Sequence, residues 1–158
     1  MSLRFVIALS LSLAASTAAH ATEVCAWLVE SNEPENVMSF DLWLQADGEV
    51  EGFYQIVGEG VTGENSTTHS RNSGTYVLHA GEAHKIWGFG TTIYPPGNID
   101  IGIELHETPA DIFSDEPTPL LAAYSFKREV PESEVAVPTT LAKKQCLPLK
   151  AEAGKAGG

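Results

Sequence analysis

Hydrophobic and polar residues alternate along much of this chain with a period of two. The clearest case is 99–106, where isoleucines and a leucine take every second position and polar residues or glycine separate them. The segments 38–45 and 120–127 repeat the pattern. Because successive side chains of a β-strand point to opposite faces, these segments are predicted to be strands with one buried face and one face toward water.

Four weaker segments complete the pattern, at 23–30, 49–57, 74–79 and 84–93. Turn-forming residues separate them, among them Asp47-Gly48, a tight hairpin signal. No segment has a convincing helical period. The predicted fold is therefore all-β, an immunoglobulin-like antiparallel β-sandwich of about seven strands.

The N-terminus has the order of a signal peptide. Arg4 precedes the apolar stretch 5–14, and Ala19 and Ala21 supply the small residues of a cleavage site. The stretch is too short for a helix across a hydrocarbon core of roughly 30 Å, and the alternative of an N-terminal core helix lacks a cap and a polar face. We expect cleavage after Ala21.

The expected organisation has three parts. They are a signal peptide at 1–21, a β-sandwich domain at 22–128, and a C-terminal extension at 129–158 that docks near Cys146 and is disordered at its end. An exported chain of this kind is expected outside the cytoplasm as a monomer, without membrane insertion once the signal is removed.

The chain is strongly acidic, with 9 Lys and Arg against 21 Asp and Glu and a net charge of −12. Such a surface repels phosphate backbones and anionic membranes, so nucleic-acid binding is not expected. Acidity also serves simply to keep an exported protein in solution.

Two cysteines, Cys25 and Cys146, lie near the two ends of the predicted domain. In an oxidising compartment an even pair is a candidate disulfide. The alternative is that Cys146 belongs to a mobile tail and never docks. Neither cysteine belongs to a CxxC motif, so thiol redox catalysis is not expected.

The sequence contains no recognisable catalytic or phosphate-binding motif, so we expect neither an enzyme nor a cofactor. No metal site is expected either, because the pair His79 and His84 and the acidic run at 111–116 lack known ligand spacing. Trp27, Trp43 and Trp87 lie on three different predicted strands. They leave open an alternative function, an exported carbohydrate- or surface-binding β-sandwich module with exposed aromatic rings.

One stretch resembles a known family. It begins at Gly52-Phe53-Tyr54, continues through the Gly, Ser and Thr-rich segment 60–78, and ends at Ala80-Gly81-Glu82. This order is similar to the central motif of the periplasmic curli assembly chaperones of the CsgC/CsgH type, nearer the CsgH branch. The likeness covers roughly 25–126. The sequence departs from the family pattern at Asn72, where glutamine is expected, in a longer 107–119 segment and in the tail that carries Cys146.

The resemblance implies a non-enzymatic chaperone that prevents premature amyloid polymerisation of curli-type subunits before their secretion. It implies such a subunit as the partner. It also points to a client-binding surface on the strand around 74–78 and the loop before it, and the residues it indicates are Tyr54, Ser70, Asn72, Gly74 and Tyr76. The alternative is that Gly74 and Asn72 only shape the turn and that Tyr76 only fills the core. Acidic side chains near a sheet edge, such as Glu49 and Glu51, would then discourage self-association.

Overall fold

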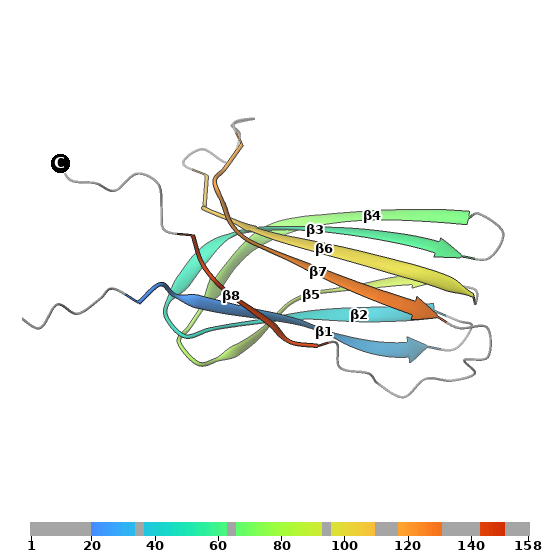
Figure 1. Ribbon diagram of the computed structural model, residues 1–158, viewed down its shortest axis with the longest axis horizontal. Helices are drawn as coiled ribbons and strands as arrows, with labels where there is room; N and C mark the ends of the chain where they lie inside the picture. Colours follow the sequence, from blue (N-terminus) through green and yellow to red (C-terminus); the bar gives the residue numbers. More distant parts are fainter. Residues whose placement is uncertain are drawn as a thin grey trace, which may run out of the picture.

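The computed structural model describes residues 20–33, 37–62, 66–92, 96–109, 117–130 and 143–150 (Figure 1). The predicted signal peptide lies outside these residues except for its last two positions. The last eight residues of the C-terminal extension, 151–158, also lie outside them.

Eight strands form two antiparallel four-stranded sheets that face each other as two layers (Figure 1). The first sheet has the order β5-β2-β1-β8, with bounds β1 Glu23–Glu33, β2 Val37–Ala46, β5 Ala83–Thr92 and β8 Gln145–Pro148. The second has the order β4-β3-β6-β7, with bounds β3 Val50–Thr62, β4 Ser66–Leu78, β6 Gly97–His106 and β7 Leu120–Val130. The predicted β-sandwich is confirmed, with one strand more than expected.

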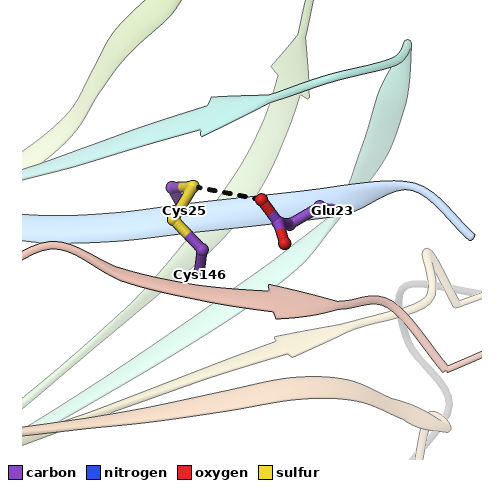
Figure 2. A group of neighbouring side chains, drawn as sticks. All are labelled: Glu23, Cys25 and Cys146. Atoms are coloured by element: carbon purple, nitrogen blue, oxygen red, sulfur yellow. Dashed lines mark hydrogen bonds between the residues drawn. A yellow bond between two sulfur atoms is a disulfide. The ribbon is translucent and has the colours of Figure 1, made fainter.

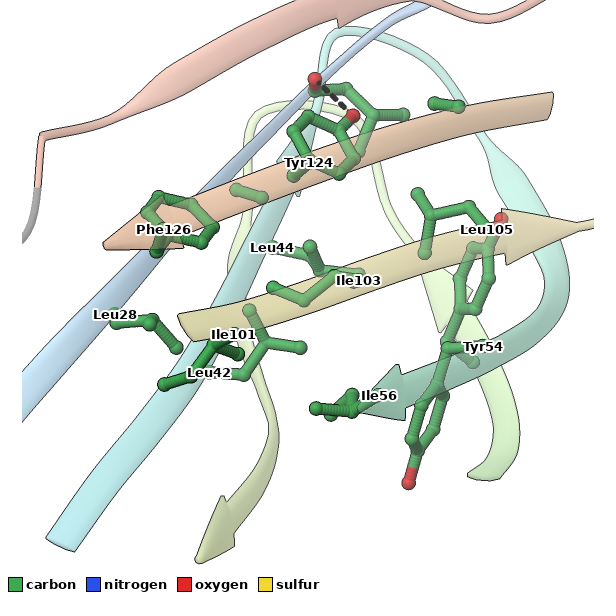
Figure 3. Close-up of a cluster of buried hydrophobic side chains, with 14 of the residues drawn as sticks. Leu28, Leu42, Leu44, Tyr54, Ile56, Ile101, Ile103, Leu105, Tyr124 and Phe126 are labelled. Atoms are coloured by element: carbon green, nitrogen blue, oxygen red, sulfur yellow. Dashed lines mark hydrogen bonds between the residues drawn. The ribbon is translucent and has the colours of Figure 1, made fainter. Parts of the chain in front are cut away.

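The core lies between the sheets and follows the alternation read from the sequence. On β6, Ile99, Ile101, Ile103 and Leu105 are buried while Asp100 and Glu104 between them are exposed. Figure 3 shows side chains of both sheets meeting in this layer. The Tyr124 hydroxyl donates a 2.7 Å hydrogen bond to the Val24 carbonyl oxygen and so joins the two sheets. Burial raises the pKa of Tyr124 well above its usual range.

The additional strand, β8, belongs to the C-terminal extension and carries Cys146. It pairs with β1 over Glu23–Ala26, and Cys25 lies directly opposite Cys146. The two form a disulfide. The predicted Cys25–Cys146 pairing is confirmed, and the alternative of an undocked Cys146 is wrong.

The loop expected before the strand at 74–78 is wrong for the described residues of 58–73. β3 and β4 run through this region and pair residue for residue as far as Thr62 and Ser66. The sequence here shows no period-two contrast because small and polar residues occupy both faces of the two strands. Backbone pairing maintains them as strands, although residues 63–65 between them lie outside the described residues.

The expectation that Glu49 and Glu51 lie near a sheet edge is also wrong. Glu51 lies on β3, which has β4 on one side and β6 on the other. Glu49 precedes β3 and accepts a hydrogen bond from the backbone N–H of Ala80. Neither carboxylate therefore protects an edge.

Candidate functional site

Three of the four edge strands carry features that prevent pairing with another chain. An edge strand presents unpaired backbone N–H and C=O groups, and bulges, lysine, proline or short length are the usual protections. β5 carries Lys85 and has a register irregularity against β2. β7 carries Lys127 and has a register irregularity against β6. β8 is four residues long and ends at Pro148.

The fourth edge strand, β4, lacks these four protections, and its one permanently charged side chain is the exposed Arg71. It has 13 residues without proline or lysine, and its register against β3 is unbroken from Val50↔Leu78 to Thr62↔Ser66. β3 is its partner in the sheet, and the opposite edge of β4 has no partner strand among the described residues. We call this outer side of β4 the β4 edge. Because it is long and regular, its backbone is the most suitable template for an added strand in the described part of the chain.

The residues indicated by the family resemblance are brought together on and beside this edge. Ser70, Asn72, Gly74 and Tyr76 occupy alternate positions of β4 and therefore share the face toward the other sheet. Ser70, Asn72 and Gly74 are partly exposed, whereas Tyr76 is 3% exposed. The opposite face of β4 is exposed throughout and includes Val77, which is 54% exposed.

Two tyrosines and two glycines interlock across β3 and β4. The pairing places Tyr54 opposite Gly74 and Gly52 opposite Tyr76. A Cβ added at Gly74 would lie 2.8 Å from the Tyr54 hydroxyl oxygen, and one added at Gly52 would lie 2.7 Å from that of Tyr76. Each ring thus covers the glycine on the neighbouring strand, which compensates for the missing side chain there.

The same packing keeps both rings in the core. Tyr54 is 6% exposed, and burial raises the pKa of Tyr76 to about 12. A direct contact between either ring and a partner is therefore not available in this structure. Their place in the site is to hold β4 straight against β3, and the residues open to a partner are Ser70, Asn72 and Gly74.

The sequence did not reveal that β4 is an edge strand. Edge position depends on which strands pair, and the alternation of side chains is the same for a central strand and for an edge strand with one buried face. The one available signal was composition, because the segment 66–75 is rich in Ser and Thr and contains no large apolar residue.

Two of the three tryptophans lie side by side on the outer face of the first sheet. Trp27 and Trp43 face each other across β1 and β2 and stack, with ring centroids 6.4 Å apart and planes 13° apart. The Lys144 ammonium lies 4.7 Å from the centre of the Trp27 ring and donates a 2.6 Å hydrogen bond to Gln45 Oε1. A sugar needs an open ring face, so this arrangement argues against a carbohydrate platform at Trp27. The side chain of Trp87 lies outside the described residues.

Glu23, Cys25 and Cys146 form a cluster of metal-ligand residue types (Figure 2). Both sulfurs belong to the disulfide, so neither is a thiolate, and thiolate is the form in which cysteine binds metals. The Glu23 carboxylate oxygen lies 4.0 Å from Cys25 Sγ. The cluster is thus one exposed carboxylate beside a disulfide, which does not form a metal centre in this state.

No helix in the described part of the chain is long and apolar enough to cross a membrane.

No protein-family model matches the chain, and no curated protein matches it in sequence. Among solved structures, the chain is similar to the solution structure of R. palustris CsgH. The TM-score is 0.45 and the sequence identity 8%, over 70% of this chain and 94% of that chain. At this identity and TM-score, the likeness concerns the overall architecture alone.

Proposed function

We propose that this protein is an exported, non-enzymatic chaperone that binds amyloid-forming curli-type subunits through the β4 edge and delays their polymerisation. The observation that carries the proposal is the contrast between this long, regular edge, which has no bulge, lysine or proline, and the three edges that have such features or are short. The resemblance of the segment 52–82 to curli chaperones supports the same surface. The disulfide fits an oxidising compartment such as the periplasm.

Strand addition explains how such a contact would act. Amyloid grows when a strand of one subunit pairs with the exposed edge of the next. A client strand paired with β4 would have one of its edges occupied. The far side of β4 is already paired with β3, so the stack cannot continue through the chaperone. Growth would therefore end at this protein.

The side chains of β4 suit a polar client strand. Ser70 and Asn72 offer hydroxyl and amide groups on one face, and the opposite face carries hydroxyls and the exposed Val77. Arg71 and His69 are the basic residues of the strand. The contact is thus expected to depend on backbone pairing and local hydrogen bonds more than on long-range attraction, because the protein as a whole is acidic.

The test is polymerisation of a curli-type subunit from the same organism, followed by thioflavin fluorescence with substoichiometric chaperone. The diagnostic variant is Asn72→Lys, which places an ammonium on the face of β4 toward the other sheet, and an inward-pointing charge on an edge strand is a natural protection against strand addition. Asn72 is only partly buried, so the lysine can reach water and the fold is expected to persist. We expect wild type to lengthen the lag phase and Asn72→Lys to lose most of that effect.

The matched control is Ala123→Lys, which adds the same charge at an exposed position of the protected edge strand β7. It is expected to delay polymerisation as well as wild type does. A second variant, Ser70→Ala with Asn72→Ala, removes side-chain hydrogen bonds and leaves the backbone edge intact, so we expect a partial loss. Equal activity of wild type and Asn72→Lys would refute the assignment of the surface, and no delay by wild type would refute the chaperone function.

A further inference from the structure

The core face of β1 contains one residue that breaks its apolar pattern. Val24, Ala26, Leu28 and Glu30 occupy alternate positions, and all four are buried. Glu30 is only 5% exposed. One carboxylate oxygen, Oε2, accepts a 3.1 Å hydrogen bond from Arg128 Nε of β7. The other, Oε1, is buried and has no hydrogen-bond partner. A buried acceptor without a hydrogen-bond donor costs free energy, so a bound molecule that donates a hydrogen bond to this atom would be stabilised.

Glu30 lines a cavity of about 190 Å³ between the two sheets. Its apolar walls come from both sheets and consist of Leu28, Phe40, Ile99, Ile101 and Phe126. Figure 3 shows Leu28, Ile101 and Phe126 at one side of the core. Since an engineered cavity of roughly 150 Å³ holds benzene, this space fits one aromatic ring with small substituents.

The cavity exists because β8 covers only part of β1. β8 pairs with Glu23–Ala26, and Gln145 at its start joins the other sheet through a 2.6 Å hydrogen bond from Nε2 to the Ser125 carbonyl oxygen. Beyond this bridge, Leu28 and Glu30 of β1 face Phe126 and Arg128 of β7 across the cavity. The exposed residues Lys127 and Lys143 line the same cavity and place its mouth at the surface.

The mouth is positively charged although the protein is acidic. Lys127 has Asp100 at 3.5 Å, whereas Lys143 has no ion-pair partner among the described residues. A ligand that satisfies this site therefore needs three features. They are a hydrogen-bond donor for Glu30 Oε1, an aromatic ring that packs beside Phe40 and Phe126, and an anionic group that reaches Lys143.

We propose that this cavity, which we call the Glu30 pocket, binds small hydroxyaryl carboxylates. The phenolic hydroxyl donates to Glu30 Oε1, the ring fills the apolar space, and the carboxylate meets Lys143 at the mouth. The site is separate from the β4 edge, so it does not depend on the proposed chaperone function. In a chaperone, the Glu30 pocket would be a small-molecule site in addition to the client-binding β4 edge.

The test uses the full mature chain and para-hydroxyphenylacetate as the probe, with binding measured by isoleucine methyl NMR shifts. Ile99 and Ile101 line the pocket, whereas Ile103 on the same strand does not. We expect saturable shifts that are larger at Ile99 and Ile101 than at Ile103. Phenylacetate lacks the hydroxyl donor, so its binding should be weaker by about tenfold or more, because a hydrogen bond to a charged group is lost.

Variants of two neighbouring lysines test whether the ligand carboxylate binds at the mouth of the pocket. Lys143→Ala should weaken the binding of para-hydroxyphenylacetate by roughly two- to fivefold, as expected for the loss of an exposed ion pair. The binding of para-cresol, which has no carboxylate, should not change. Lys144→Ala is the matched control, because Lys144 lies over Trp27 and does not line the pocket. The absence of saturable shifts would mean that Glu30 Oε1 is merely hydrated and would overturn the proposal. Equal binding of phenylacetate would overturn it too, as would equal effects of the two lysine variants.

Discussion

Removing the Cys25–Cys146 disulfide is expected to destabilise the protein strongly while leaving its fold intact. The change is Cys25→Ala together with Cys146→Ala. β8 is short, and Cys146, Leu147 and Pro148 are exposed. Few core contacts therefore depend on the bridge, and β5, β2 and β1 still form the first sheet without β8. The loss of stability comes mainly from the unfolded chain, which gains freedom once the link is gone.

The loop length sets the magnitude of this effect. The two cysteines are 121 positions apart. In the chain-entropy model, closing a loop of that length removes about 5 kcal/mol of unfolded-state entropy at room temperature. For a domain of this size, the corresponding fall in Tm is roughly 15–20 °C.

The assay is thermal unfolding followed by circular dichroism, with wild type measured oxidised and reduced beside the double variant. Reduced wild type and the double variant should unfold at similar temperatures, with a native β-sheet spectrum below the transition. Leu147→Ala is the control, because it perturbs β8 at an exposed position and keeps the link, so its Tm should fall by only a few degrees, about 1–4 °C. A double variant whose Tm falls no further than that of Leu147→Ala would refute the entropic reasoning.

Two further predictions concern the second sheet and its ends. Gly52→Ala should lower the free energy of unfolding by about 1–3 kcal/mol in denaturant titrations, because the new Cβ would lie 2.5 Å from the His106 carbonyl oxygen; Gly60→Ala, which meets no atom within 4 Å, should be close to neutral. The hydrogen bond between Glu49 and His79 lowers the pKa of Glu49 and raises that of His79. The stabilisation from His79 is complete below its unfolded pKa near 6.5 and is lost as pH rises through the raised folded pKa, whereas that from Glu49 is complete above about 4.5 and is lost as pH falls through the lowered one. In NMR titrations, Glu49→Gln should return the His79 pKa toward its ordinary value, and an unchanged His79 pKa would contradict this pairing.

The strand pattern and the disulfide were accessible from the sequence because both depend on local or pairwise chemistry. The alternation on β2, β6 and β7 follows directly from which side chains need burial, and two cysteines in a chain that is expected to be exported have few alternatives to pairing with each other. The motif at 52–76 likewise contained the tyrosines and glycines that interlock across β3 and β4. The sequence left burial of Tyr76 as one of two alternatives, because glycine opposite tyrosine becomes visible only once the register is known.

Tertiary structure alone decided what the candidate sites are. The β4 edge exists because β3 pairs with β4 and β6, which no local pattern specifies. The strands through 58–73 are maintained by pairing with each other rather than by an apolar face. Glu30 reads as an ordinary polar residue at the end of a predicted strand, and its burial beside Arg128 requires β7 to cross from 98 residues away along the chain. Which edge remains free and which buried oxygen lacks a donor are properties of contacts between distant segments, so they follow from the fold and not from any stretch of sequence.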